Sequence, residues 1–365
     1  MANALKVGLI GCGNICNQYF AGLKKFAITD LVACADLDFS RAEAKAAEHG
    51  VKPYTVEGLL ADKEIDIVIN LTIPAAHAPV NLAILEAGKH AYTEKPFCLS
   101  LEDGKAVIAK AAAKGLRTGC APDTFLGGGI QTCRKLIDDG AIGTPVAAIA
   151  NMYGHGPEGW HPDPEFFYQF GGGPMLDMGP YYLTALVNLL GPIGRVSGAV
   201  TAGLKERIVG SGKKQGTKIP VTVPTHYAGA YEFTEGAVAS VNMSFDVWHH
   251  QLPIIEIYGT EGTLSVPDPN GFGGKVSVRR SDEKEWREVA HTHPVDVGRG
   301  IGVADMATGI RKNRPHRASG ELALHVFEGM QAVEAAAKQG AYYRMTTPCD
   351  RPAALPVNLP IGELD

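Results

Sequence analysis

The chain has 365 residues, of which 45% are hydrophobic and 20% are charged, and its formal net charge is -5. This length exceeds what one hydrophobic core usually fills, so two domains are expected. The slightly acidic balance gives no electrostatic reason to expect nucleic acid or an anionic membrane surface as a partner.

The seven cysteines are scattered, and none of them forms a Cys-x-x-Cys pair or has zinc-type spacing. They are therefore expected to be reduced, mostly buried residues, and no metal site is predicted. An apolar strand pattern begins at residue 4, which leaves no room for a signal peptide before it. We therefore expect a cytoplasmic protein without a membrane span.

The first pattern along the chain is an apolar strand over residues 4–10, a glycine turn and a helix. Gly11 allows a tight turn, and Gly13 allows the backbone to approach a pyrophosphate at the N-terminus of the helix. Cys16 stands at the third glycine position, so the fingerprint is imperfect. The second strand ends in Asp36, at the position of a carboxylate that binds the hydroxyl groups of an adenine ribose.

Asp36 favours NAD over NADP as the cofactor, because a carboxylate there repels an added 2′-phosphate. Arg41 lies nearby on the predicted helix and keeps NADP as the alternative. Asp36 could instead be only a helix cap or a turn residue. The combined order of strand, glycine turn, helix, strand and aspartate favours the interpretation as a cofactor site.

Helix and strand patterns continue to alternate after Asp36, which predicts a doubly wound parallel sheet, a Rossmann domain over residues 1–122. His77 lies in a loop of this domain and is either a contact to the nicotinamide or, more commonly for such a loop, a structural residue. The remaining predicted elements are a helix at 41–49, a strand at 65–71, a loop at 72–77, a helix at 79–87, a strand at 90–94, a helix at 101–114 and a strand at 116–121.

Lys95 lies between Glu94 and Pro96, directly after a predicted strand. Proline restricts the residue before it to extended backbone, so the ammonium group leaves the sheet at a defined place. The sequence does not decide whether the Lys95-Pro96 bond is cis. In isolation the lysine would be read as a solvated charge paired with Glu94. Because ligands bind beyond the carboxyl ends of such strands, we instead predict that Lys95 transfers a proton.

Residues 123–365 are predicted to form a second α/β domain, because the parallel pattern stops at residue 122. Period-two alternation and hairpin turns over residues 194–290 predict a large, predominantly antiparallel open sheet. Ser319 is predicted to cap a last helix. This helix and the tail after it could pack back on the first domain. Arg317 is either a substrate contact or a brace for that helix.

The loop at 154–164 is rich in glycine and proline and carries Trp160 and His161. Such a loop is either functional, with these two residues as substrate contacts, or a packed surface loop. Three glycines at 171–173 then precede an apolar helix. Asp177 and Tyr181 lie on one face of that helix, where they could hold a sugar hydroxyl, although one could be an N-cap and the other a core residue.

Four motifs in this order resemble the glucose-fructose oxidoreductase, inositol dehydrogenase and rhizopine-catabolism (Gfo/Idh/MocA) family: residues 11–15, 72–77 and 94–96, and the glycines 171–173 with Asp177. The resemblance implies a nicotinamide cofactor, oxidation of a sugar-like or cyclitol substrate at a secondary carbon, and homodimers or homotetramers built sheet to sheet. Most members have a histidine where this chain has Tyr181, but some resemble it in having tyrosine there. Histidine titrates near neutrality and tyrosine does not, so the difference bears on proton transfer.

The motifs and the resemblance together predict three groups of site residues. Lys95 should accept the alcohol proton, Tyr181 should share or relay it, and Asp177 should orient the substrate. The predicted substrate contacts are Trp160, His161 and Arg317. The predicted cofactor-binding residues are Gly11, Cys12, Gly13, Asn14, Ile15, Asp36, Thr72, Pro74, His77, Glu94 and Lys95.

The predicted function is hydride transfer between a secondary alcohol of a sugar, sugar derivative or cyclitol and NAD. One alternative is an NAD-dependent glycosidase, which oxidises its substrate transiently, eliminates the aglycone, adds water and re-reduces the product. The other alternative is a cofactor-binding regulator without turnover. The intact set of Lys95, Asp177 and Tyr181 argues against the regulator.

Overall fold

The computed structural model describes residues 4–365, which form two compact units. The first unit comprises the described residues up to Gln131 together with His291–Leu324 and Pro352–Asp365. The second comprises Thr132–Ala290 and His325–Arg351. The predicted domain ranges, 1–122 and 123–365, stay a prediction.

The first unit contains a six-stranded parallel sheet in the order β3-β2-β1-β4-β5-β6. This is the strand order of a dinucleotide-binding Rossmann fold, so the predicted fold class is confirmed for this unit. All carboxyl ends of its strands lie at one edge, which we call the carboxyl edge. The strands are β1 (Leu5–Ile10), β2 (Thr29–Ala35), β3 (Lys52–Tyr54), β4 (Ile67–Asn70), β5 (His90–Thr93) and β6 (Thr118–Cys120).

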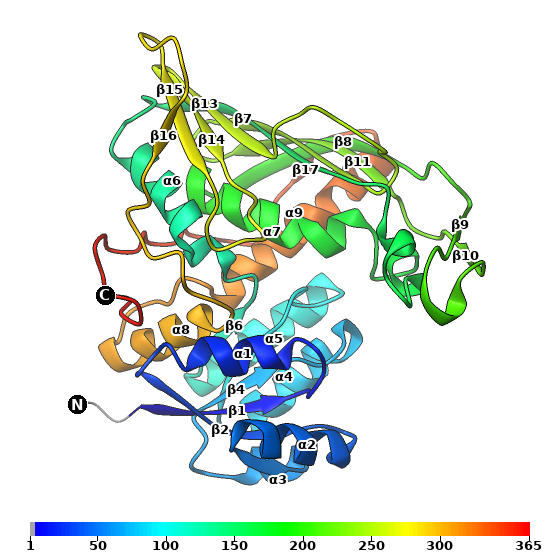
Figure 1. The fold of residues 1–365 in the computed structure, drawn as a ribbon, viewed down its shortest axis with the longest axis vertical. Helices are drawn as coiled ribbons and strands as arrows, with labels where there is room; N and C mark the ends of the chain where they lie inside the picture. The colour runs from blue at the N-terminus through cyan, green and yellow to red at the C-terminus, as the bar shows by residue number, and fades with distance from the viewer. Residues whose placement is uncertain (1–3) are drawn as a thin grey trace. The chain divides into compact units, whose positions relative to one another are not determined.

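The helices of the first unit cover its sheet, and α1 and α8 lie side by side (Figure 1). Local sequence signals define several of their ends. The Ser100 side chain caps α5 by accepting the N–H of Asp103, and Gly115 ends that helix in the left-handed region. The helices are α1 (Cys16–Leu23), α2 (Phe39–His49), α3 (Val56–Ala61), α4 (His77–Glu86), α5 (Leu101–Lys114) and α8 (Ile301–Lys312), with 3₁₀ turns η1 (Pro74–Ala76) and η2 (Thr124–Leu126).

Sequence periodicity did not predict α8. Nine consecutive residues of this helix, 301–309, are buried, so its apolar positions do not follow the one-sided pattern of a surface helix. Asp123 supports the start of α8 from a distance, because its Oδ2 accepts the N–H groups of Gly300 (2.9 Å) and Gly302 (3.1 Å).

The second unit contains a nine-stranded sheet in the order β16-β15-β14-β13-β7-β12-β11-β8-β17. Only β7 and β12 pair in parallel, so the predicted, predominantly antiparallel sheet is confirmed. The strands are β7 (Pro145–Tyr153), β8 (Ile193–Thr201), β11 (His226–Phe233), β12 (Val238–Ser244), β13 (Ile255–Gly259), β14 (Gly262–Val266), β15 (Val276–Arg280), β16 (Arg287–Val289) and β17 (Tyr343–Arg344).

Helix α7 (Pro174–Leu190) packs against β7, β11 and β12 of this sheet, and α9 (Gly320–Gln339) runs near it (Figure 1). Ser319 caps α9 as predicted, since its Oγ accepts the N–H of Leu322 at 3.1 Å. Helix α6 (Gly128–Asp138) begins in the first unit and ends in the second. Among residues 4–365, no helix combines the length and the apolar character that crossing a membrane requires.

A separate two-stranded hairpin, β9 (Glu206–Ile208) with β10 (Lys218–Pro220), lies outside the large sheet. The sequence pattern did not distinguish it from the strands of that sheet. Three 3₁₀ turns complete the second unit: η3 (Pro157–Gly159), η4 (Glu165–Tyr168) and η5 (Gly212–Lys214).

Candidate functional site

The glycine turn after β1 forms the first part of the candidate site at the carboxyl edge. Gly11 has a φ of +104°, and a Cβ there would lie 2.6 Å from the carbonyl oxygen of Leu71, so only glycine fits. A Cβ on Gly13 would meet no atom within 4 Å, so the turn borders open space. Asn14 is exposed, and Ile15 immediately precedes α1. Open space before a helix N-terminus suits the negative charge of a pyrophosphate.

Asp36 lies directly after β2 and holds the glycine turn. Its Oδ2 accepts the N–H of Cys12 at 2.8 Å, and its Oδ1 accepts the N–H of Asp38 at 3.0 Å. Each carboxylate oxygen can accept a further hydrogen bond, so Asp36 retains the capacity to bind ribose hydroxyls. Arg41 is exposed and lies 3.6 Å from the Asp38 carboxylate.

Two exposed apolar side chains at the carboxyl edge were missed by the sequence analysis. Leu37, just beyond β2, is 96% exposed, and Ile73, just beyond β4, is 70% exposed. Exposing large apolar groups to water is unfavourable, so this pair suits contact with a flat, weakly polar group such as an adenine ring. An apolar residue two or three positions beyond a strand end was the available sequence signal.

A buried amide organises the loop that follows β4. Asn70 Oδ1 accepts both the N–H (3.2 Å) and the hydroxyl (2.6 Å) of Thr72, and its amide nitrogen donates to the carbonyl oxygen of His77 at 3.0 Å. Pro74 is exposed and begins η1. The position of Thr72 is therefore set by hydrogen bonds from the strand end.

His77 is buried and joins this loop to the residue after Lys95. Its Nδ1 lies 2.6 Å from the carbonyl oxygen of Pro96, and its Nε2 lies 3.0 Å from that of Thr72. Burial lowers the pKa of His77, whereas the two carbonyl contacts act in the opposite direction. This placement fits a linking residue, and the assignment of His77 as a cofactor contact stays a prediction.

Lys95 follows β5 at the same edge, and its backbone is fixed on both sides. Its N–H donates to Glu94 Oε2 at 3.0 Å, and the bond to Pro96 is cis. Glu94 is buried, and its Oε1 accepts the hydroxyl of Tyr19 on α1 at 2.9 Å. The Lys95 side chain is half-buried, so it is partly shielded from water. The backbone position from which it extends is held in one place.

Asp177 and Tyr181 both lie on α7 of the second unit. Four positions separate them, so they share a face as predicted; Asp177 is half-buried in the first turn and Tyr181 is buried. Glycine is required where the helix starts, because Gly173 has a φ of +91° and a Cβ on Gly172 would lie 2.3 Å from the carbonyl oxygen of Phe166. Their catalytic roles stay a prediction.

Trp160 and His161 lie in the loop at 154–168 of the second unit. The Trp160 side chain is 69% exposed, and its ring meets that of His161 edge to face at a centroid distance of 5.5 Å. His161 Nδ1 accepts the N–H of Asp163 at 3.1 Å. An exposed indole beside an imidazole offers a ligand an apolar face and a hydrogen-bonding group.

Arg207, a buried arginine on the β9–β10 hairpin, anchors this loop. The sequence pattern did not indicate this role of Arg207. The Arg207 side chain is buried, and it forms ion pairs with two carboxylates, those of Glu158 and Asp246. The Glu158 carboxylate also accepts the hydroxyl of Tyr168. The four acceptors of Arg207 are the His155 carbonyl oxygen (3.0 Å), Glu158 Oε1 (2.8 Å), the Phe245 carbonyl oxygen (2.9 Å) and the Asp246 carboxylate.

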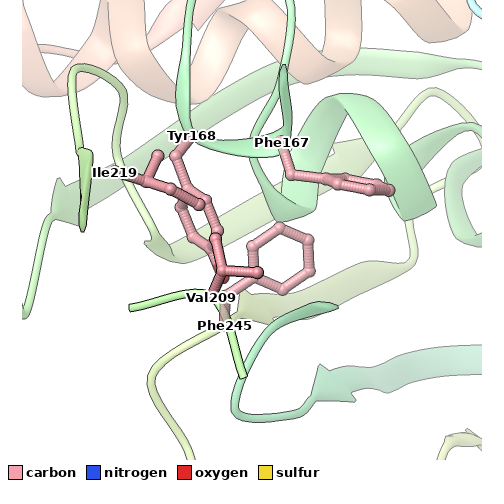
Figure 2. Packing of buried hydrophobic residues seen from close by; sticks show 5 residues of the cluster. All are labelled: Phe167, Tyr168, Val209, Ile219 and Phe245. Atoms are coloured by element: carbon pink, nitrogen blue, oxygen red, sulfur yellow. The ribbon is translucent and has the colours of Figure 1, made fainter. Parts of the chain in front are cut away.

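An apolar cluster beside Arg207 joins the same hairpin and loop. Figure 2 shows Val209 and Ile219 of the hairpin region facing Tyr168, with Phe245 between Val209 and Phe167. The N–H of Gly210 also donates to the carbonyl oxygen of Glu158 at 2.7 Å. The hairpin therefore determines the path of the loop that carries Trp160.

Arg317 is buried in the first unit, where the C-terminal tail surrounds its guanidinium group. It donates to the Asp305 carboxylate at 2.5 Å, to the carbonyl oxygens of Ala353 (3.0 Å) and Ala354 (3.2 Å), and to Asp365 at 3.3 Å. These bonds fit the alternative in which Arg317 is a brace. Its role as a substrate contact stays a prediction that this placement does not favour.

Both units match models of one protein family. Residues 5–121 match the oxidoreductase family with an NAD-binding Rossmann fold, and residues 130–265 match the GFO/IDH/MocA C-terminal domain. Among curated proteins, the chain is 28% identical over 265 residues to a 1,5-anhydro-D-fructose reductase of Ensifer adhaerens, covering 70% of this chain and 74% of that one. It is 26% identical over 287 residues to a levoglucosan dehydrogenase of Pseudarthrobacter phenanthrenivorans, covering 71% and 73%.

Solved structures share the fold over nearly the whole chain. An NAD-binding oxidoreductase from Klebsiella pneumoniae has a TM-score of 0.82 at 22% identity and covers 95% of this chain and 100% of its own. A levoglucosan dehydrogenase in complex with NADH has a TM-score of 0.80 at 23% identity, with coverage of 94% and 100%. With the two family matches, which together span most of the sequence, the chain belongs to the GFO/IDH/MocA family and is an NAD-binding oxidoreductase.

Proposed function

We propose that this oxidoreductase interconverts a secondary alcohol and a ketone on a sugar, sugar derivative or cyclitol. The observation that carries the proposal is Lys95, a half-buried lysine held by Glu94 at the same carboxyl edge as the glycine turn and Asp36. The 1,5-anhydro-D-fructose reductase and the levoglucosan dehydrogenase are named for sugar derivatives, which supports this substrate class.

Lys95 is proposed to accept the hydroxyl proton of the alcohol as the carbon–hydrogen bond breaks. NAD, when bound, supplies the acceptor for the hydride at its nicotinamide C4, so the alcohol becomes a ketone and one proton remains on the protein. Asp177 is proposed to accept a hydrogen bond from a substrate hydroxyl. Tyr181 is proposed to take part in the proton transfer, and Trp160 and His161 to contact the substrate. The cofactor is assigned to the turn at 11–15, to Asp36 and to the loop at 72–77.

NAD is expected to bind more tightly than NADP. Asp36 should accept ribose hydroxyls and repel a 2′-phosphate, since both of its oxygens retain acceptor capacity. Titration of each cofactor by protein fluorescence measures the preference. In the Asp36→Ser variant the preference should shrink at least tenfold, whereas Arg41→Ala should leave NAD binding unchanged. The opposite result would be tighter binding of NADP than of NAD by the unmodified protein. If Arg41→Ala also removed that preference, the cofactor specificity would be assigned to Arg41.

A second copy of the chain is proposed to cover the open face of the large sheet. Several exposed residues on strands β8, β11 and β12 are small, so two such surfaces can approach closely: Ser197, Ala199, Ala228, Ala230 and Ser240. The proposal is a homodimer or homotetramer. Sedimentation analysis of Ala230→Arg, which places a charge among these small residues, should show dissociation; a monomer before substitution would refute the proposal.

The assay that tests the proposed reaction offers sugars, cyclitols and glycosides with stoichiometric NAD, and sugar ketones with NADH. NADH absorbance is followed together with ketone formation and aglycone release. Accumulated NADH that matches ketone formation supports a dehydrogenase. Aglycone release without net NADH would identify a redox-neutral glycosidase, in which the hydride returns to the product. Binding of NAD without turnover of any compound would support a regulator.

A further inference from the structure

Tyr19 is a buried residue to which neither the motifs nor the proposed mechanism gives a role. It lies on α1, the helix whose N-terminus borders the open space at Gly13, and its side chain is completely buried. Its hydroxyl donates to Glu94 Oε1 at 2.9 Å, and Glu94 Oε2 accepts the N–H of Lys95 at 3.0 Å. One buried carboxylate thus connects the cofactor helix to the backbone of the proposed catalytic lysine.

We propose that Tyr19 is a positioning residue, which holds the Glu94 carboxylate beside Lys95 and shares its negative charge. The proposal rests on the proposed function only in taking Lys95 as the proton-transfer group. A hydrogen bond to an ionised acceptor is stronger than one between neutral groups, and it spreads the charge of the anion. A carboxylate whose charge is shared holds a neighbouring ammonium proton less firmly than one whose charge is not shared.

The environment of the Tyr19 hydroxyl favours its protonated form. Burial raises the pKa of Tyr19 well above its usual value, and the nearby Glu94 charge raises it further. Tyr19 therefore acts as a constant donor and not as a titrating group. The other titratable groups that influence Tyr19 or Glu94 come from several elements: Tyr92, Asp123, Arg299, His77 and Cys120.

Tyr92 offers a matched control for the loss of a hydroxyl. It is also a completely buried tyrosine, on β5, and within residues 4–365 its hydroxyl has no hydrogen-bond partner. Tyr92→Phe therefore removes the same atom from a comparable environment without removing a bond to Glu94. A general effect of deleting a buried hydroxyl would appear in both variants, whereas the proposed effect should appear only in Tyr19→Phe.

The test measures the protonation of Lys95 without a substrate. Trace labelling with acetic anhydride modifies only neutral amines, and peptide mass spectrometry gives the labelling of Lys95 at each pH. In Tyr19→Phe the midpoint should move upwards by about one pH unit, because Glu94 loses a charge-assisted hydrogen bond. In Tyr92→Phe it should not move. Glu94→Gln should move it downwards, because the charge itself is removed.

The double variant Tyr19→Phe/Glu94→Gln decides whether Tyr19 acts through Glu94. Its midpoint should equal that of Glu94→Gln alone, because no charge is left to share. An unchanged midpoint in Tyr19→Phe, an equal shift in Tyr92→Phe, or a Tyr19 effect that persists in the double variant would overturn the proposal. These results are independent of turnover. Normal turnover in a Lys95→Met variant would refute the proposed function, whatever the labelling shows.

Discussion

Replacing Lys95 by methionine is expected to lower turnover by roughly 10²–10⁴-fold, the usual contribution of general acid-base catalysis. Methionine retains the length of the side chain and removes the amine that would accept the alcohol proton. The backbone of residue 95 should stay in place, since its N–H group donates to Glu94 Oε2. NAD affinity by fluorescence titration and the thermal midpoint should therefore change little. Steady-state kinetics with the best substrate of the panel measures the loss in kcat.

An exposed lysine of the same unit provides the control for this substitution. Lys105 lies exposed on α5, so Lys105→Met changes the same atoms at a surface position and should leave kcat unaltered. Comparing Lys95→Met, Tyr181→Phe and the double variant then asks whether both groups serve one step. If they do, the double variant should be little worse than Lys95→Met alone. Near-normal turnover in Lys95→Met would remove this residue from the mechanism.

The Arg207→Met variant is expected to lose about 3–5 kcal/mol of stability, the usual result of breaking a buried ion pair. Methionine fills much of the volume but leaves the buried Glu158 carboxylate and the half-buried Asp246 carboxylate without their cation. For a unit of this size, such a loss lowers the thermal midpoint by roughly 10 °C. Differential scanning calorimetry measures this change, and NAD titration reports on the other unit.

Lys214 provides a control in the same part of the chain. It pairs with Asp163 of the loop at 2.6 Å, but both side chains are largely exposed, so water and salt screen the pair. Lys214→Ala should leave the midpoint unchanged. Partial unfolding limited to the loop would increase proteolysis near Trp160 in Arg207→Met before the main transition. Equal midpoints for Arg207→Met and the unmodified protein would show that the buried ion pairs do not hold this loop.

Several parts of the candidate site could be predicted because they depend on neighbours in the sequence. Gly11 was expected to form a tight turn, and its φ of +104° confirms this need for glycine. The α5 range, 101–114, was predicted from helical periodicity and agrees with the helix, which begins after the cap Ser100. Asp177 and Tyr181 share a face because a four-residue separation sets their direction on any α-helix.

Tertiary structure alone decided which distant groups meet. The Tyr19 hydroxyl donates to the Glu94 carboxylate, 75 positions later in the sequence. Arg207 donates to Glu158, a loop residue 49 positions earlier. Helix α8 escaped prediction because its burial on all sides removes the amphipathic pattern by which surface helices are found. Sequence patterns indicate local backbone preferences and which side of a helix or strand is buried. The choice of partner depends on which strands become neighbours, since only the folded sheet places those side chains within hydrogen-bonding distance.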